Sequence, residues 1–145
     1  MNKYTVVLEK VQEYDAVNYK VTNPQSIIPV IENVFNLSNQ SEEVLVVLAL
    51  STKGDVVGAF EVHRGSLNQT LLHPREIFKR VMLVNGASFI VAHNHPSGNP
   101  SPSNQDFEVT RVLHKGGQLL DIEMLDHLII GFGGKTFSFR EHSAL

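Results

Sequence analysis

The chain has 145 residues, of which 42% are hydrophobic and 19% charged, the composition of one ordinary globular domain. Its net charge of −3, with histidine neutral, does not favour a nucleic-acid partner. The chain has no cysteine, which excludes disulfides, a thiol nucleophile and every thiolate metal site. The longest apolar run, residues 44–50, is far shorter than the roughly 20 residues of a membrane span, and residues 1–11 lack the apolar region of a signal peptide. We therefore expect a cytoplasmic protein with no membrane partner.

The first half of the chain predicts a strand, a helix and a hairpin. Residues 4–11 are rich in β-branched side chains and predict an N-terminal strand. Asn23-Pro24 is typical of a helix start and is followed by apolar residues at helical spacing. Residues 43–52 and 56–62 are two apolar runs joined by the tight turn Lys53-Gly54-Asp55, which predicts a β-hairpin.

The second half predicts alternating helices and strands. Pro74 begins a helix that Asn85-Gly86 ends, and a further helix starts near Ser103 and breaks at Gly116-Gly117. The expected strands are residues 87–92, 121–130 and 135–139. We expect residues 1–23 to be a strand-like extension and residues 24–145 to form one domain, a sheet flanked by about three helices, in an α/β or α+β arrangement.

The segment His93-Asn94-His95-Pro96 carries the clearest chemistry. Side chains at positions i and i+2 of an extended backbone point the same way, so both imidazoles can reach one ion. Asp106, expected in the first turn of the following helix, can return a carboxylate as a third ligand. Three ligands of this kind leave the fourth position of zinc open for water, which is the arrangement of a catalytic site.

The predicted zinc site needs a base to take a proton from its water and deliver it to the leaving group. Glu61, near the end of the second hairpin strand, is the predicted base, and Ser103 is the predicted donor to the oxyanion. A carboxylate at a strand end is also commonly an ordinary solvated group. Ser103-x-x-Asp106 is equally a capping box, a role that competes with the metal for the Asp106 carboxylate.

Two further histidines have open roles. His127 follows Asp126 on an expected strand and either orients a metal ligand or is a hydrogen-bonded structural residue. His63 lies two residues after Glu61 and is expected on the same side of that strand, where it either touches substrate or is simply exposed.

The combined order of these residues resembles a known signature. Glu61, His93-x-His95-Pro96, Ser103 and Asp106 follow the JAMM pattern of the JAB/MPN zinc metalloproteases. The amino-acid sequence of residues 93–103 is similar to that of the RadC branch of this superfamily, as are the sequences His73-Pro74-Arg75-Glu76 and residues 125–131. The similarity extends from about Pro24 to the C-terminus.

The resemblance implies an α/β fold, a cytidine-deaminase-like three-layer α/β/α sandwich with a mixed sheet and about three helices. It implies a zinc ion (Zn²⁺) held by His93, His95 and Asp106, with Glu61 as general acid and base and Ser103 as oxyanion donor. The implied activity is hydrolysis of a peptide or isopeptide bond, and in the wider superfamily the substrates are often ubiquitin-like proteins.

The alternatives are a non-catalytic RadC-like module that binds protein or DNA, in keeping with the DNA-repair label of that branch, and a zinc hydrolase of nucleic acids or small amides. Longer RadC-like proteins carry a helix-hairpin-helix segment ahead of this domain, whereas residues 1–23 look like a strand. An exposed strand at residues 4–11 could pair with an extended substrate or with a second copy in a homodimer. The sequence does not define the oligomeric state.

Overall fold

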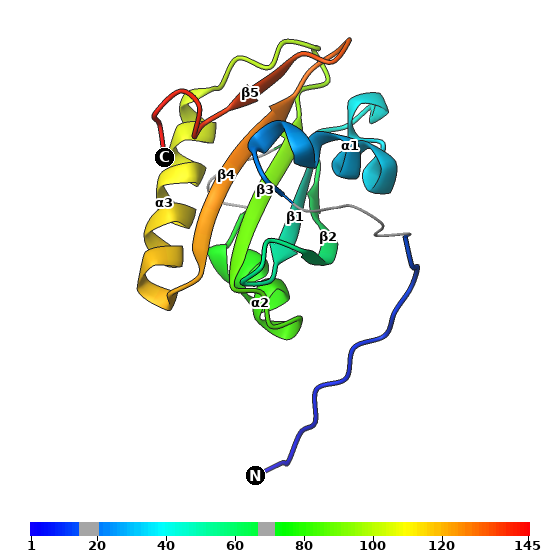
Figure 1. Cartoon of the computed structure of the whole chain (residues 1–145), viewed down its shortest axis with the longest axis vertical. Helices are drawn as coiled ribbons and strands as arrows, with labels where there is room; N and C mark the ends of the chain where they lie inside the picture. Colours follow the sequence, from blue (N-terminus) through cyan, green and yellow to red (C-terminus); the bar gives the residue numbers. More distant parts are fainter. Residues whose placement is uncertain (15–20, 67–71) are drawn as a thin grey trace.

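The computed structural model describes residues 1–14, 21–66 and 72–145 (Figure 1). Helices and strands alternate along most of the described chain. In order, the elements are α1 (Pro24–Phe35), η1 (Leu37–Asn39), β1 (Val44–Leu50), β2 (Val56–Arg64), α2 (Pro74–Leu83), β3 (Ser88–Asn94), α3 (Asn104–Leu120), β4 (Glu123–Ile130) and β5 (Thr136–Ser138).

The described strands form one mixed sheet in the order β2-β1-β3-β4-β5. β1 and β2 are the predicted hairpin, and β3 and β4 are a parallel pair joined through α3. β1 also runs antiparallel to β3, with Leu45 paired to His93. The beginning of β1 therefore meets the end of β3, and the end of β4 lies beside it, with Asn94 paired to Ile130.

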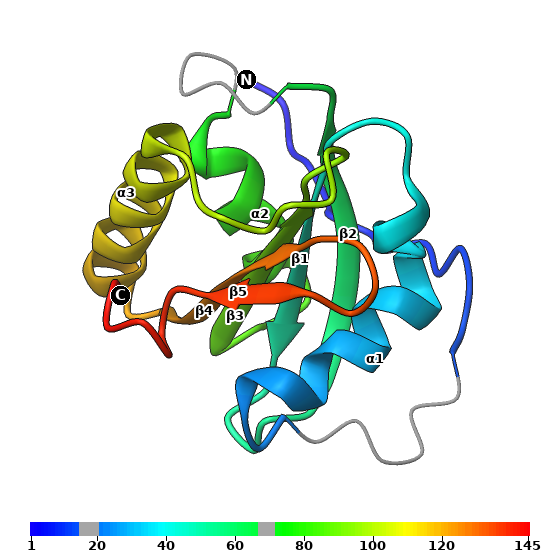
Figure 2. The ribbon, with the colours of Figure 1, turned by 90° about the horizontal axis from the view of Figure 1, so that it is seen from above.

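The sheet is covered on both faces (Figure 2). Leu45, Val47 and Ala49 of β1 pack in a cluster with α2 and α3, whereas Val46 and Leu48 pack in a second cluster with α1. Because successive side chains of a strand point to opposite faces, a strand buried on both sides must be apolar throughout, as β1 is. The predicted α/β class and mixed sheet are confirmed, the described residues contain three α-helices where about three were predicted, and the layers follow the order α/β/α.

The sequence predicts that the helix breaks at Gly116-Gly117, but α3 continues through both glycines to Leu120. A side chain at Gly117 would come within 2.5 Å of the carbonyl oxygen of Ile122, and one at Gly116 would meet the ring of Phe78 at 2.8 Å. The two glycines therefore permit close packing of the helix instead of ending it. The helix ends at Asp121, which adopts the left-handed conformation with φ 56°.

The prediction of a strand at residues 4–11 is wrong. The structure gives these residues no strand, and Figure 1 shows them extended away from the sheet (blue). Tyr4, Val7 and Val11 are largely exposed. An apolar, β-branched stretch forms a strand only when a neighbouring strand supplies hydrogen-bond partners, and within the described chain none does so here. Residues 15–20 of the predicted extension lie outside the described residues.

No helix among the described residues is both long enough and apolar enough to cross a bilayer.

Candidate metal centre

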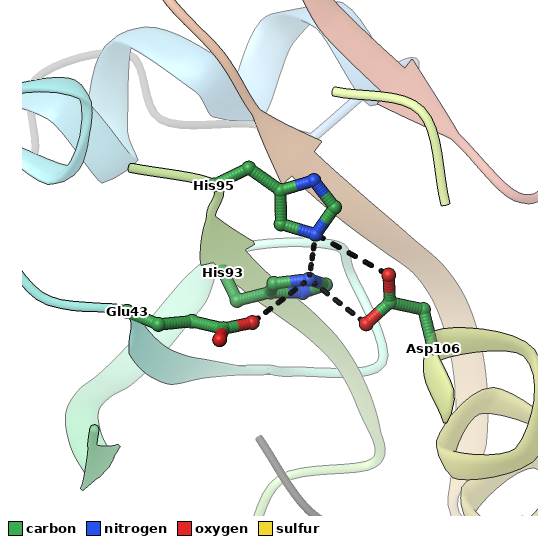
Figure 3. Close-up of side chains that lie close together, drawn as sticks. All are labelled: Glu43, His93, His95 and Asp106. Atoms are coloured by element: carbon green, nitrogen blue, oxygen red, sulfur yellow. Dashed lines mark hydrogen bonds and ion pairs between the residues drawn. The ribbon is translucent and has the colours of Figure 1, made fainter. Parts of the chain in front are cut away.

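Three polar side chains converge at the end of β3 (Figure 3). His93 pairs with Leu45 of β1 near the end of β3 and is fully buried. His95 follows directly, with its backbone N–H donating to the carbonyl oxygen of Ile130 at 3.0 Å. Asp106, in the first turn of α3, is also buried and points its carboxylate at both imidazoles. The predicted His-x-His and Asp residues are thus brought together.

The distances between these side chains match the spacing of ligands around one ion. The Nε2 atoms of His93 and His95 lie 3.1 Å apart. Asp106 Oδ1 lies 3.1 Å from His93 Nε2, and Oδ2 lies 3.3 Å from His95 Nε2. Tetrahedral zinc with bonds of about 2.0 Å holds its ligand atoms roughly 3.3 Å apart. The three atoms could therefore bind one zinc ion with little movement.

Ser103 and Asp106 also form the capping box of α3. The Ser103 hydroxyl accepts from Asp106 N–H at 3.1 Å, and Asp106 Oδ2 accepts from Ser103 N–H at 2.7 Å. The capping role and the predicted metal role are compatible in this geometry, because Ser103 N–H donates to Oδ2 whereas Oδ1 lies 3.1 Å from His93 Nε2. The cap orients the carboxylate toward the histidines.

The protonation of His95 follows from its other ring nitrogen. Nδ1 lies 2.8 Å from the carbonyl oxygen of Asn99. Because a carbonyl can only accept, Nδ1 carries the proton, and in neutral His95 the lone pair is on Nε2, which faces His93 and Asp106. Gly98 supports this loop: its φ of 84° suits glycine, and its carbonyl oxygen accepts from Phe132 N–H at 3.0 Å.

The electrostatics of the cluster favour a bound cation. Burial opposes the ionisation of Asp106, but the hydrogen bond and charge of His93 and the hydrogen bonds from Ser103 outweigh it, so the pKa of Asp106 lies well below its usual range. When both imidazoles are neutral, a bound cation would supply the positive charge that a protonated His93 otherwise places beside this carboxylate. Divalent zinc suits this set of two nitrogens and one oxygen.

Glu43 is the fourth member of the group. It immediately precedes β1, and its Oε1 lies 3.7 Å from His93 Nε2 (Figure 3). Ligand atoms of Glu43, His93, His95 and Asp106 all lie within 4.8 Å of one another. The side chains of Glu43 and His95 are 22% and 17% exposed, whereas those of His93 and Asp106 are almost completely buried. Solvent therefore reaches the cluster on the Glu43 and His95 side.

Comparison with known families agrees with this geometry. The profile of the RadC-like JAB domain matches residues 21–144. The chain belongs to the RadC-like JAB domain family.

Its relatives include several proteins named only UPF0758. One from Clostridium beijerinckii is 42% identical over 126 residues, which cover 87% of this chain and 54% of the relative. One from Bacillus licheniformis is 54% identical over 91 residues, 63% of this chain and 41% of the relative. A third, from Chlorobaculum parvum, is 42% identical over 129 residues, covering 89% and 57%. The chain thus spans about half the length of these relatives.

In this RadC-like domain Glu61, the predicted base, is not part of the candidate metal centre. Its carboxylate pairs with Arg64, with Oε1 2.9 Å from Nε and Oε2 3.0 Å from Nη2, and its side chain is 43% exposed. The prediction assumed that β2 lies beside β3, but β1 separates them. Glu61 is paired with Val46, which faces α1, whereas His93 is paired with Leu45 on the opposite face. Glu43, and not Glu61, is the glutamate whose carboxylate lies next to His93.

A β-bulge changes the expected side of His63. Val46 is paired with Glu61 but the preceding residue, Leu45, is paired with His63, so one extra residue of β2 lies between them. Glu61 and His63 therefore lie on opposite faces of the sheet, and His63 shares the face of His93. Its Nε2 is buried without a hydrogen-bond partner.

Sequence reasoning missed Glu43 as well as the contacts of His127. His127 Nε2 lies 2.8 Å from His93 Nδ1, which is the contact that its predicted orienting role requires. Burial, followed by the neighbouring His93, holds the pKa of His127 well below its usual range, so the ring is neutral. The only local signal for Glu43 was its position directly before the most apolar strand of the domain.

Proposed function

We propose that this RadC-like JAB domain is a zinc-dependent hydrolase, a metallopeptidase or isopeptidase of the JAMM type. The observation that carries the proposal is the convergence of His93 Nε2, His95 Nε2 and the Asp106 carboxylate, with mutual distances of 3.1, 3.1 and 3.3 Å. These three side chains are the proposed zinc ligands. The open side of the group, next to Glu43, is where water and substrate would enter.

Zinc bound there would supply a Lewis acid and lower the pKa of a coordinated water to about 7. Glu43, 3.7 Å from His93 Nε2, is placed to take the proton from the attacking water and to return it to the leaving amine. This assignment replaces Glu61. Ser103 accepts a hydrogen bond from Asp106 N–H, which leaves its own hydroxyl hydrogen available to stabilise the oxyanion of a tetrahedral intermediate.

The substrate class rests on the family. Membership of the JAB domain family suggests that the bond hydrolysed is an amide. We propose that the substrate is a peptide or an isopeptide, including isopeptides formed by ubiquitin-like proteins. Exposed polar residues lie close in sequence to Glu43, His95 and Asp106, among them Glu42, Ser97 and Ser101, and such residues suit an extended polypeptide better than an apolar small molecule.

The test combines metal analysis with an unbiased cleavage screen. Protein purified without added metal is measured for zinc, and wild type, His95→Ala and Glu43→Gln are screened against peptide and isopeptide libraries. We expect about one zinc per wild-type chain and cleavage by wild type alone. Natively folded wild-type protein that takes up no zinc would refute the proposal. A salt-dependent shift with DNA that His95→Ala leaves unchanged, together with no cleavage, would favour the binding module instead.

A further inference from the structure

A series of buried hydrogen bonds joins His93 to Asp106 on the side of His93 away from the proposed zinc position. Because His93 and Asp106 also contact each other, the series forms a closed ring. His93 Nδ1 lies 2.8 Å from His127 Nε2, and His127 Nδ1 lies 2.6 Å from Thr110 Oγ1. Thr110 Oγ1 in turn donates to the backbone carbonyl oxygen of Asp106 at 2.6 Å. This series of hydrogen bonds therefore begins at one proposed zinc ligand, His93, and ends at the backbone of another, Asp106. All four residues are buried.

The direction of every hydrogen in this chain follows from the carbonyl at its end. A carbonyl oxygen only accepts, so the single hydroxyl hydrogen of Thr110 points to Asp106. Thr110 Oγ1 must then accept from His127, which places the proton of neutral His127 on Nδ1. His127 Nε2 consequently has a lone pair and accepts from His93 Nδ1–H. In neutral His93 the lone pair is then on Nε2, the atom that faces His95 and Asp106.

Ring packing holds His127 in the orientation that this chain needs. Its ring stacks on Phe139, with centroids 4.8 Å apart and planes 12° apart. Phe139 is fully buried and meets Phe107 edge to face. A β-bulge in β4 gives His127 its side of the sheet: Phe89 pairs with Met124, but the next residue, Ile90, pairs with Asp126.

We propose that His127 and Thr110 are positioning residues that hold His93 in the Nδ1–H tautomer and so present its Nε2 lone pair to the metal. The inference rests on the proposed zinc site. Without the Thr110 hydroxyl, the buried Nδ1–H of His127 has no acceptor, and His127 gains by moving its proton to Nε2. That proton would then point at His93 Nδ1 and drive His93 toward the Nε2–H tautomer, which has no lone pair on Nε2 for a metal held with His95 and Asp106. Restoring the binding tautomer would cost metal affinity.

The test compares zinc affinity and tautomer state in matched variants. Zinc affinity is measured by competition with a chromophoric chelator, and the His93 tautomer is read from long-range ¹H–¹⁵N spectra of the metal-free protein. Thr110→Val keeps the shape and removes the hydroxyl, whereas Thr110→Ser keeps the hydroxyl. Ser138→Ala is the control, because Ser138 is also buried but donates to Asp126 at 2.6 Å and touches no ligand.

We expect Thr110→Val to bind zinc at least about tenfold more weakly than wild type and to lose the His93 Nδ1–H signal. Thr110→Ser and Ser138→Ala should keep both. Equal zinc affinity in Thr110→Val and Ser138→Ala, or an unchanged His93 tautomer, would overturn the inference. If Thr110→Val does not fold, Thr110→Ala carries the same test. Wild type that binds no zinc would refute the proposed function, and the tautomer spectra of the metal-free protein would then decide the positioning inference separately.

Discussion

Glu43, the residue before β1, faces His93 of the neighbouring antiparallel strand β3, with Glu43 Oε1 3.7 Å from His93 Nε2. The carboxylate is on the solvent-accessible side of the cluster, and the imidazole is completely buried. The two residues are 50 positions apart in the sequence. Their proximity arises because β1 begins where β3 ends.

This contact predicts different outcomes for two glutamate variants. Glu43→Gln should lower hydrolysis by roughly 10²- to 10⁴-fold, the usual contribution of a general base, and should still bind zinc. Glu61→Gln is the matched control and should hydrolyse like wild type, because Glu61 is on the other face and pairs with Arg64. Turnover and zinc content are measured on the same preparations. Loss of activity in Glu61→Gln with normal activity in Glu43→Gln would reverse the assignment.

Metal binding should stabilise the folded chain. Because the proposed ligands converge only in the fold, zinc at one hundred times its Kd should raise the free energy of unfolding by about 2.7 kcal/mol. Urea unfolding with zinc and with excess chelator measures the difference. Asp106→Asn keeps an acceptor for the Ser103 N–H but removes the charged ligand, so this variant should gain little. A similar gain in both proteins would place the zinc elsewhere.

The capping box of α3 predicts a combined effect on stability and on the site. Ser103→Ala should lower the free energy of unfolding by about 1 kcal/mol and also weaken zinc binding, because Ser103 orients the Asp106 backbone and carboxylate. Asn23→Ala removes the equivalent cap of α1, far from the site, and should cost about as much stability with unchanged zinc affinity. Chemical unfolding and chelator competition separate the two effects. Unchanged zinc affinity in Ser103→Ala would contradict the orienting role.

The loop after His95 should be sensitive to a single methyl group. Gly98 has φ 84°, and a Cβ there would overlap the ring of Phe132. Gly133 has φ 62° with nothing near its Cβ position. Gly133→Ala should therefore cost about 1 kcal/mol from backbone strain alone, and Gly98→Ala about 1–3 kcal/mol more from the overlap. Thermal unfolding compares them. Zinc affinity should fall only in Gly98→Ala, which disturbs the Asn99 carbonyl that holds His95.

Asp126 predicts a pH dependence of stability. Burial raises the pKa of Asp126 even though its carboxylate accepts from Ser138, Arg140 N–H and His127 N–H. The folded chain therefore keeps a proton on Asp126 at pH values where the unfolded chain, with a pKa of about 3.9, has lost it. As pH rises from that value through the raised folded pKa, the contribution of this group to stability falls.

Asp126→Asn removes the titration. The difference in unfolding free energy between the variant and wild type should shift in favour of the variant over this pH window, by at most about 1.4 kcal/mol per pH unit. Urea unfolding at closely spaced pH values above 4 measures it. Parallel stability curves for the two proteins would show that Asp126 does not titrate as described.

Local residue patterns were sufficient for most elements of the fold. The Asn23-Pro24 start of α1, the β1–β2 hairpin, and the proximity of His93, His95 and Asp106 all depend on residues close together in the chain. Alternation along a strand and the first turn of the next helix place these three side chains without knowledge of the rest of the fold. The pair Gly116-Gly117 shows where local reasoning ends, because the residues that explain it, Phe78 and Ile122, belong to other elements.

Strand order and register, by contrast, were decided by the tertiary structure. Glu43 lies just before β1 and Glu61 lies toward the end of β2, at the same end of the sheet, and the sequence offers no means of choosing between them. The choice depends on β1 lying between β2 and β3, and on which face each strand residue points to. The chain from His93 through His127 and Thr110 likewise joins three elements and depends on a one-residue bulge in β4. Local periodicity determines which residues share a face, but only packing determines which faces and edges meet.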